Sequence, residues 1–357
     1  MKLIRTVDAE GTVLCHDITQ IIKGVTKDAV FRKGHVVTKE DIPVLLSVGK
    51  DQLYVWEKEE GMLHENDAAE ILCEMCKGEH MERSQAKEGK IELTAACDGL
   101  LKVNNPAMKA VNGFGQMMIA SRHGNFAVKK GDKLAGTRII PLVIEEEKMK
   151  AARAEAMEVT GGKPILELKP FVHKKVGIVT TGNEVFYGRI QDTFTPVIEE
   201  KLAGFDTEVM DHVTWNDDDK KVTASILDMI EKGADVVICT GGMSVDPDDK
   251  TPLAIKNTGA RIVSYGAPVL PGAMFLLAYY EVAAERCKEG TKPRTVAVMG
   301  LPGCVMYAKR TIFDLVLPRV MADDVVTAEE LAALGQGGLC LNCPVCTFPN
   351  CGFGKGC

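Results

Sequence analysis

Hydrophobic residues from about residue 172 to residue 322 follow an alternation of two patterns. Apolar runs rich in β-branched residues predict strands, namely VGIVTT, EVMDHV, ADVVICT, ARIVSYG and TVAVMG. Amphipathic stretches between them predict helices, namely TPVIEEKLAGF, DDKKVTASILDMIEKG, TPLAIKNTG and CVMYAKRTIFDLVLPRVM. Continuous apolar strands separated by helices are typical of a parallel sheet covered on both faces. We therefore expect an α/β domain with a three-layer parallel sheet over residues 172–322.

The remaining chain divides into three further regions. Residues 1–142 mix short β-like runs, HVVTKEDIPVLLSVG among them, with Gly- and Lys-containing turns and one helix near residues 65–77. This indicates a mixed, β-rich α/β region. Residues 143–171 predict a helix that Gly161 and Gly162 end, followed by a linker. Residues 323–357 combine a short helix, AEELAALG, with a cysteine-rich tail.

Composition narrows the class of protein. The 357 residues are 46% hydrophobic and 26% charged, which excludes a disordered or fibrous chain. The net charge of −7 gives no indication of nucleic-acid binding. The first residues, MKLIRTVD, carry charges rather than the apolar core of a signal peptide, and the most apolar run, residues 273–284, contains Glu281 and is shorter than the roughly 20 residues of a membrane span. We expect a cytoplasmic protein without a membrane partner.

Glycine-rich loops follow the predicted strands, and these are the candidate ligand site. Ligands of open parallel sheets bind at the carboxyl ends of the strands, and glycine lets backbone N–H groups approach an anion closely. Four loops at one edge therefore predict a site for a phosphate or another oxyanion. Their candidate binding residues are Thr181, Gly182 and Glu184; Gly241, Gly242 and Ser244; Pro271 and Gly272; and Leu301, Pro302 and Gly303.

Acidic residues lie in or beside the same loops. Asp246, Asp248 and Asp249 follow Gly242, and residues 217–219 are a run of three aspartates at the start of a predicted helix. Carboxylates beside a phosphate need a cation between them, and Mg²⁺ takes one or two carboxylates together with phosphate oxygens. Helix capping is the alternative role for residues 217–219. We take Asp249 and Asp218 as the candidate catalytic residues, with Asp217 as the alternative to Asp218.

The order of these motifs resembles one known family. The motifs TGxE, GGxSxxxxD, PG and LPG follow one another between residues 172 and 322. Together they resemble the molybdopterin-binding domain shared by molybdopterin adenylyltransferases (MoaB/Mog type) and molybdopterin molybdenumtransferases (MoeA, gephyrin and Cnx types). The resemblance implies that the domain binds molybdopterin or its adenylylated form at the strand carboxyl ends. It further implies Mg²⁺, a homo-oligomer and an acceptor molybdoenzyme.

Two reactions and a third, non-catalytic role are consistent with this resemblance. The run FRKGHVVTKEDIPVLLSVGKDQLYV resembles the N-terminal region of the molybdenumtransferases, which favours insertion of molybdate, a substrate, into adenylylated molybdopterin. The run Asp249-Lys250-Thr251-Pro252 resembles the adenylyltransferases instead. A carrier or sensor that binds the pterin or the finished cofactor without turnover is the third hypothesis.

Cysteines are concentrated at the end of the chain. Five of twelve lie in the last eighteen residues, and Cys340, Cys343, Cys346 and Cys351 are spaced by two, two and four residues. Such spacing suits one tetrahedral Zn²⁺ or one iron–sulfur cluster, and the spacing alone does not distinguish them. A tail with reduced thiols is the alternative. Cys73 and Cys76 with His80 form a second possible cluster, for which ordinary packing of thiols is the favoured interpretation.

Overall fold

The computed structural model describes residues 2–22, 26–55, 60–244, 246, 249–283 and 293–356. The chain forms two units. The first contains residues 1–96, 103–122 and 130–168, and the second contains residues 97–102, 123–129 and 169–357. After the segments 97–102 and 123–129, the chain enters the second unit for the last time along β13 (Leu166–Pro170). Within the described residues, no helix is both long enough and apolar enough to cross a membrane.

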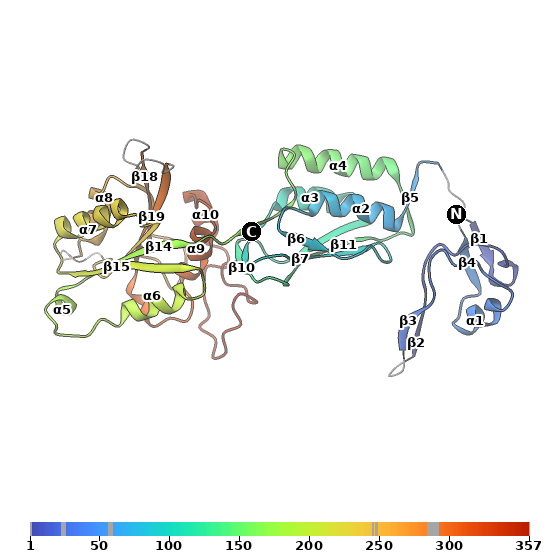
Figure 1. Ribbon diagram of the computed structural model, residues 1–357, viewed down its shortest axis with the longest axis horizontal. Coiled ribbons are helices and arrows are strands. Elements are labelled where there is room, and N and C mark those ends of the chain that lie inside the picture. Colours follow the sequence, from blue (N-terminus) through green and yellow to red (C-terminus); the bar gives the residue numbers. More distant parts are fainter. Residues whose placement is uncertain are drawn as a thin grey trace. The chain divides into compact units, whose positions relative to one another are not determined.

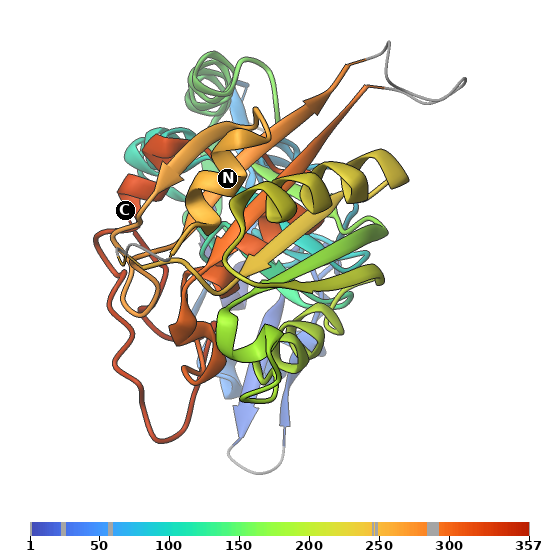
Figure 2. The same cartoon turned by 90° about the vertical axis from the view of Figure 1, so that its left-hand side faces the viewer.

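The second unit is built on a six-stranded sheet (Figures 1 and 2). In spatial order its strands are β15 (Thr207–Trp215), β14 (Lys174–Thr181), β16 (Val236–Thr240), β19 (Arg294–Leu301), β18 (Leu276–Val282) and β17 (Arg261–Tyr265). The first four are mutually parallel, as the sequence predicts. β18 runs antiparallel to both β19 and β17. This strand, which the sequence shows only as an apolar run, is missing from the sequence prediction.

Helices cover both faces of this sheet, which gives the expected three layers. Side chains alternate along each strand, so that Val236 and Ile238 of β16 enter one core while Val237 and Cys239 enter the other. The first core contains α6 (Phe194–Leu202), α9 (Ile312–Met321) and Leu331 of α10 (Ala328–Ala333). The second core contains α7 (Asp219–Lys232) and α8 (Thr251–Asn257). The α/β fold class is confirmed.

One predicted helix is divided in two. The stretch from Cys304 to Met321 forms a 3₁₀ turn, η3 (Gly303–Met306), and then α9. Thr311 interrupts the helix because its hydroxyl accepts a hydrogen bond from the N–H of Phe313, while the Asp314 carboxylate accepts one from the N–H of Thr311. This reciprocal capping box fixes a new helix start.

The first unit contains a four-stranded antiparallel sheet in the order β6 (Met81–Arg83), β7 (Lys90–Ala95), β11 (Lys133–Ile139) and β9 (Met117–Ser121). Its longer helices are α2 (Glu65–Cys76), α3 (Asn105–Gly113) and α4 (Glu146–Thr160). Gly161, with φ of 64°, ends α4 where the sequence predicts. Paired short strands complete this unit: β1 (Lys2–Arg5) with β4 (Gln52–Val55), β2 (Ile18–Ile22) with β3 (Thr26–Phe31), and β5 (Met62–His64) with β12 (Val143–Glu145).

Residues 1–142 contain two helices, α1 (Asp41–Ser47) and α3, in addition to the one helix that the sequence predicts there. α1 lies within HVVTKEDIPVLLSVG, which the sequence indicates as β-like. The Asp41 carboxylate accepts hydrogen bonds from the N–H and hydroxyl of Thr38, and Leu45 is fully buried, so local capping and core packing outweigh the β-branched composition. α3 begins after Asn104, whose side chain accepts a hydrogen bond from the N–H of Ala107.

Candidate functional site

The predicted binding loops all leave the same edge of the six-stranded sheet. In the parallel register Thr180 lies beside Thr240, and Thr240 lies beside Leu301, so β14, β16 and β19 end together. Tyr265, the last residue of β17, pairs with Leu276, which in turn pairs with Gly300. The loop that holds Pro271 and Gly272 therefore begins at this edge as well. We call this edge the carboxyl edge.

The centre of the carboxyl edge is a close approach between two of the predicted loops. A side-chain carbon on Gly241 would lie 2.0 Å from the carbonyl oxygen of Thr181, and one on Gly242 would lie 2.9 Å from the Thr251 hydroxyl oxygen. Both glycines also have positive φ, 77° and 55°. The Thr181 hydroxyl lies 3.1 Å from the Thr240 carbonyl oxygen and 3.0 Å from the Thr251 hydroxyl. The sequence identified both glycines and Thr181, but gave Thr251 no role in the site.

The other predicted binding residues contribute mainly backbone. Gly182 has φ of 139°, and Gly272 lies so close to α9 that a side-chain carbon would be 2.5 Å from Ile312 Cγ2. Leu301 is fully buried in the core, and Pro302 is the buried residue before η3, which Gly303 begins. Pro271 accepts a hydrogen bond at its carbonyl oxygen from the N–H of Ile312. Glu184 is exposed on the short helix α5 (Asn183–Phe186).

The acidic loop after Gly242 is organised around Ser244. The Ser244 N–H donates to Asp249 Oδ2 over 2.8 Å, and the Ser244 hydroxyl donates to Asp246 Oδ2 over 3.1 Å. Tyr265 donates its hydroxyl to the Met243 carbonyl oxygen, and burial together with the Asp249 charge raises the pKa of Tyr265. Asp248 lies outside the described residues. The structure thus brings Ser244 and Asp249 together and adds Tyr265, whose place at a strand end was the only sequence signal for it.

Asp218 occupies the N-cap of α7. Its Oδ1 accepts hydrogen bonds from the N–H groups of Lys220 and Lys221, at 3.1 and 3.3 Å. Its Oδ2 lies 3.8 Å from Lys221 Nζ. This is the capping geometry that the sequence offers as the alternative to a catalytic role for residues 217–219, and a cap of this kind leaves the carboxylate half-buried near the end of β15.

Two buried polar atoms at the carboxyl edge have no hydrogen-bond partner within the described part of the chain: Thr240 Oγ1 and Asn216 Oδ1. Thr240 ends β16 directly before Gly241, and Asn216 follows β15. Buried polar atoms without a partner are rare in folded proteins, because each loses its hydration without compensation. Their position at this edge is consistent with a bound polar ligand or water.

A polar network that was not predicted from the sequence lies beside the carboxyl edge, between β14, β15 and the start of α6. The Thr180 hydroxyl is 3.0 Å from His212 Nε2 and 3.2 Å from the Thr195 hydroxyl, and the Thr195 hydroxyl donates to Asp192. Burial raises the pKa of Asp192, but hydrogen bonds from Thr195 and Phe194 outweigh it and hold the pKa below its usual value. This network ties the start of α6 to the ends of β14 and β15.

Three cysteines outside the tail, Cys73, Cys76 and Cys239, are buried and serve as packing residues. Cys239 is fully buried in the sheet, and burial raises the pKa of its thiol to about 12. Burial also raises the pKa values of Cys73 and Cys76, which lie on the buried face of α2. A thiol with a raised pKa is a poor nucleophile and a poor metal ligand at neutral pH.

The four predicted metal ligands of the tail line one cavity of about 240 Å³. Nevertheless, across the described ranges, no three His, Cys, Asp or Glu side chains are placed closely enough to hold one metal ion. A hydrogen bond from the Phe348 backbone and the nearby Arg310 guanidinium lower the pKa of the Cys346 thiol. A larger cavity of about 570 Å³ lies beside α6 and α9, and its walls contain none of the predicted site residues.

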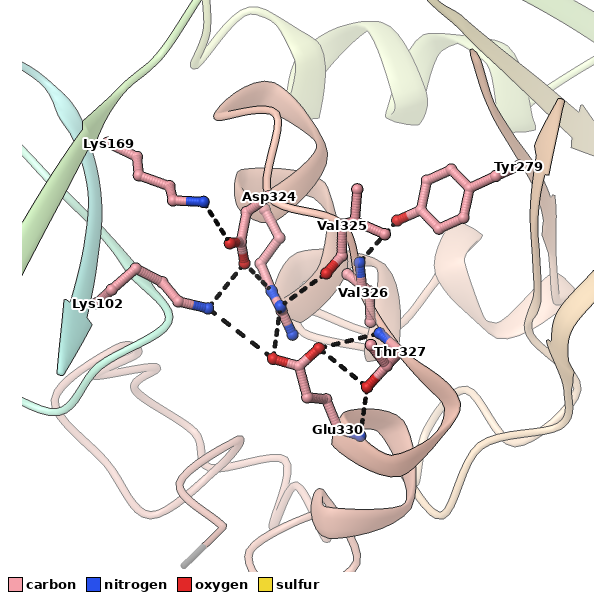
Figure 3. Close-up of polar contacts among 9 residues, drawn as sticks. Lys102, Lys169, Tyr279, Asp324, Val325, Val326, Thr327 and Glu330 are labelled. Atoms are coloured by element: carbon pink, nitrogen blue, oxygen red, sulfur yellow. Dashed lines mark hydrogen bonds and ion pairs between the residues drawn. The ribbon is translucent and has the colours of Figure 1, made fainter. Parts of the chain in front are cut away.

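A buried charge network holds the segment after α9 against the core of the second unit (Figure 3). Asp324 accepts hydrogen bonds from Lys102 and Lys169, both at 2.8 Å, and from Arg319 at 2.6 Å. Arg319 also donates to Glu330. Burial alone raises the pKa of Asp324, but these cations outweigh it and bring the pKa to about 2. The network contains none of the predicted site residues.

Comparison with known families assigns the domain that carries the carboxyl edge. Residues 177–322 match the family model described as "Probable molybdopterin binding domain", and residues 3–57 match a domain of unknown function. The sheet, its helices and the loops of the carboxyl edge all lie in or directly beside the first match. Residues 177–322 are therefore similar to the molybdopterin-binding domain family.

Curated relatives match a shorter segment of the chain than the family model does. A CinA-like protein of Mycobacterium tuberculosis is 34% identical over 80 residues, which is 22% of this chain and 19% of that protein. A CinA-like protein of Syntrophus aciditrophicus is 39% identical over 83 residues, 23% of this chain and 19% of that protein. The chain thus spans about a fifth of the length of the curated relatives it matches.

Solved structures with similarity to the chain include two MoaB proteins. One is a molybdopterin biosynthesis enzyme from Thermus thermophilus, with 21% identity and a TM-score of 0.30, covering 41% of this chain and 91% of that chain. The other is a tungsten cofactor synthesizing protein from Pyrococcus furiosus, with 21% identity and a TM-score of 0.31, covering 42% of this chain and 89% of that chain.

Proposed function

We propose that the domain binds adenylylated molybdopterin at the carboxyl edge and inserts molybdate into it, releasing AMP, as a step of molybdenum cofactor biosynthesis. The observation that carries this proposal is the convergence of the loops after β14, β16 and β19, with the glycines of one loop packed against Thr181 of another. The match of residues 177–322 to a molybdopterin-binding family gives the class of ligand.

In this proposal the loops bind and orient the phosphate groups. Gly241 and Gly242 allow the loops to pack closely around Thr181 and so bring their backbone groups to one place, and the Thr240 hydroxyl, which has no partner among the described residues, supplies a further polar group. Such reactions require a positioned phosphate and stabilisation of the charge that develops on it, both of which fixed backbone groups provide without rearrangement. The Ser244–Asp249 hydrogen bond holds the acidic loop in shape beside this surface.

The acidic loop fits a magnesium ion. Asp246 and Asp249 both bond to Ser244, so two carboxylates are presented by one short loop, and carboxylate oxygen is the donor that Mg²⁺ prefers. A closed cage of protein ligands is not required, because Mg²⁺ usually keeps waters and substrate phosphates in its coordination shell. When bound, the ion supplies charge neutralisation for the phosphate oxygens. Asp218, near the end of β15, is the second proposed catalytic carboxylate.

Adenylylation of molybdopterin with Mg-ATP is the second candidate. The observation in its favour is Thr251 of the run Asp249-Lys250-Thr251-Pro252, since this hydroxyl is buried and bonded to Thr181 at the centre of the carboxyl edge. The two reactions use the same groups but act oppositely on one bond: adenylylation forms the phosphoanhydride bond between the molybdopterin phosphate and AMP and releases pyrophosphate from ATP, whereas molybdate insertion breaks that bond and releases AMP.

One experiment with two arms separates the candidates. Purified protein with adenylylated molybdopterin, Mg²⁺ and molybdate should release AMP only when molybdate is present. Protein with molybdopterin and Mg-ATP should form no adenylylated product. Formation of that product would favour the adenylyltransferase, and tight pterin binding without turnover in either arm would leave a carrier or sensor. The oligomeric state and an acceptor molybdoenzyme stay proposals that follow from the same assignment.

A further inference from the structure

The C-terminal tail is a packed part of the second unit. Phe353 is buried in the core that contains α9, and a side-chain carbon on Gly354 would lie 2.3 Å from Leu315 Cδ2. A side-chain carbon on Gly338 would lie 2.3 Å from the Pro268 carbonyl oxygen. Glycine is therefore required where the tail touches the domain, and these contacts fix both ends of the segment that carries the cysteines.

All four tail cysteines face one space. Cys340, Cys343, Cys346 and Cys351 line the cavity of about 240 Å³ together with Phe348 and Phe353, which we call the thiol cavity. Cys343 and Cys346 are exposed, whereas Cys340 and Cys351 are partly buried against the core. The cavity thus has two ligands at its mouth and two at its base.

The tail thiols do not converge on a position where a single ion could be held by three of them. A tetrahedral zinc with sulfur at 2.3 Å would bring its thiolates to about 3.8 Å from one another. Although all four tail cysteines are described, no group of three among the described residues is placed to hold one ion. Thiols that surround a shared cavity without converging on a point suit a larger object than one metal ion.

The walls of the thiol cavity are also positively charged. Lys309 and Arg310, which follow η3, both line it, and Lys309 Nζ donates to the carbonyl oxygens of Cys343 and Pro344. The Arg310 guanidinium stacks over Phe348 at 4.8 Å. Arg310 Nε is buried and has no hydrogen-bond partner within the described parts of the chain. Arg310 Nη1 is ion-paired with the Asp314 carboxylate at 2.9 Å, so among the described residues the uncompensated positive charge on this wall comes from Lys309, while the Arg310 Nε N–H can still donate a hydrogen bond to an anionic guest.

We propose that the thiol cavity binds a [4Fe–4S] cluster through Cys340, Cys343, Cys346 and Cys351. The four thiols lose their protons, and each thiolate forms one bond to an iron of a core built from two ferrous ions, two ferric ions and four sulfides, so that assembly requires no further oxidant. The thiolate-bound cluster is an anion, which matches Lys309 and Arg310. The tail pairs with the carboxyl edge, because Cys340 N–H donates to the Leu270 carbonyl oxygen and Leu270 N–H donates to Gly338, directly before Pro271 and Gly272. The proposed cluster therefore lies beside the loop that contains Pro271 and Gly272, which we propose contacts the pterin.

The test is anaerobic reconstitution of the full-length protein with ferrous iron, ferric iron and sulfide. We expect about four irons and about four acid-labile sulfides per chain, a broad absorption band in the visible region, and an electron paramagnetic resonance signal after reduction. Cys343→Ser and Cys346→Ser replace exposed residues, so each variant should fold normally and lose most of the iron. Cys97→Ser, a thiol of the same unit that does not line the cavity, is the matched control and should keep it.

Several results would overturn this proposal. One is binding of about one zinc per chain by the same cysteines with no assembly of iron and sulfide. Another is a chain that retains no metal of either kind under these conditions. A third is full iron content in both serine variants, which would place the iron elsewhere. None of these outcomes depends on turnover at the carboxyl edge, so the proposal stands or fails separately from the proposed function.

Discussion

Asp249 accepts a hydrogen bond from the backbone N–H of Ser244, across a distance of 2.8 Å, and thereby closes the acidic loop onto a residue two positions after Gly242. The bond holds a carboxylate beside the glycine loop that we propose binds the phosphate groups of the ligand. It also explains how a flexible glycine sequence can present an acid in a fixed place, since the acid and the glycines share one short turn.

Replacement of this acid should remove turnover without unfolding the protein. Asp249→Asn keeps the size of the side chain but removes the charge proposed to hold Mg²⁺, so we expect AMP release to fall by about a hundredfold or more. Glu231→Gln, which removes an exposed carboxylate at the far end of α7, is the matched control and should retain full activity. Equal rates for Asp249→Asn and the wild type would show that the acid is misassigned.

Asp218 allows capping to be separated from catalysis. Asparagine caps helices about as well as aspartate, so Asp218→Asn should change the free energy of unfolding by less than about 0.5 kcal/mol, whereas Asp218→Ala should cost about 1 kcal/mol. If Asp218 is also catalytic, both variants should lower the rate of AMP release by about tenfold or more. A normal rate in Asp218→Asn would limit this residue to its capping role. Urea unfolding and the AMP assay give the two readouts.

Gly241 should be far less tolerant of a side chain than other glycines with a similar backbone. Gly241→Ala places a carbon 2.0 Å from the Thr181 carbonyl oxygen, so we expect a loss of about 2–4 kcal/mol in the free energy of unfolding. Gly259 has φ of 83° and open space around it, and Gly259→Ala should cost only about 1 kcal/mol. Similar losses in the two variants would mean that the close approach of the loops does not exist in solution.

The charge network around Asp324 should make stability depend on acid pH. The pKa of Asp324 is about 2 in the folded protein and about 3.9 in an unfolded chain, so the folded state binds fewer protons. Its contribution, of about 2 kcal/mol, is complete above pH of about 4 and is lost as the pH falls to about 2.

Asp324→Asn should remove this step and destabilise the protein at neutral pH by about 3–5 kcal/mol, because Arg319 is then left buried without its partner. Asp228→Asn, in an exposed pair with Lys232, should change neither property by more than a few tenths of a kcal/mol and serves as the control. Denaturant titrations between pH 2 and 7 provide the measurement. An unchanged acid profile in Asp324→Asn would contradict the assignment.

The sequence predicts the parts of this protein whose pattern is local. The strand Val236–Thr240 is buried at every position, and such a run can be recognised without knowing its neighbours. The direction of β18 could not be predicted, because Leu276–Val282 shows only that the segment is apolar, and its antiparallel pairing with β17 and β19 depends on tertiary contacts. Short helices such as α1 were missed for the same reason, since Leu45 owes its place to the core around it.

In the candidate site, too, residues in local motifs could be predicted from the sequence, whereas residues brought together by tertiary contacts could not. Gly241 and Asp249 are visible in the sequence because motif spacing fixes them. Thr251, Tyr265 and the His212 network are visible only when strands from distant parts of the chain are brought to one edge. The thiol cavity is the clearest case: its four cysteines lie within one short segment of the sequence, but Lys309 and Arg310, which also line it, lie about thirty residues earlier.

The central claim is that the carboxyl edge is the pterin site, and equilibrium binding of adenylylated molybdopterin tests it most directly. Ser244→Tyr places a bulky group on an exposed residue of this edge, while Thr295→Tyr places the same group on an exposed residue at the opposite end of β19. We predict one molecule bound per wild-type chain, at least a tenfold weaker dissociation constant for Ser244→Tyr, and no change for Thr295→Tyr. Wild-type affinity in Ser244→Tyr, or no binding by the wild type, would contradict the account.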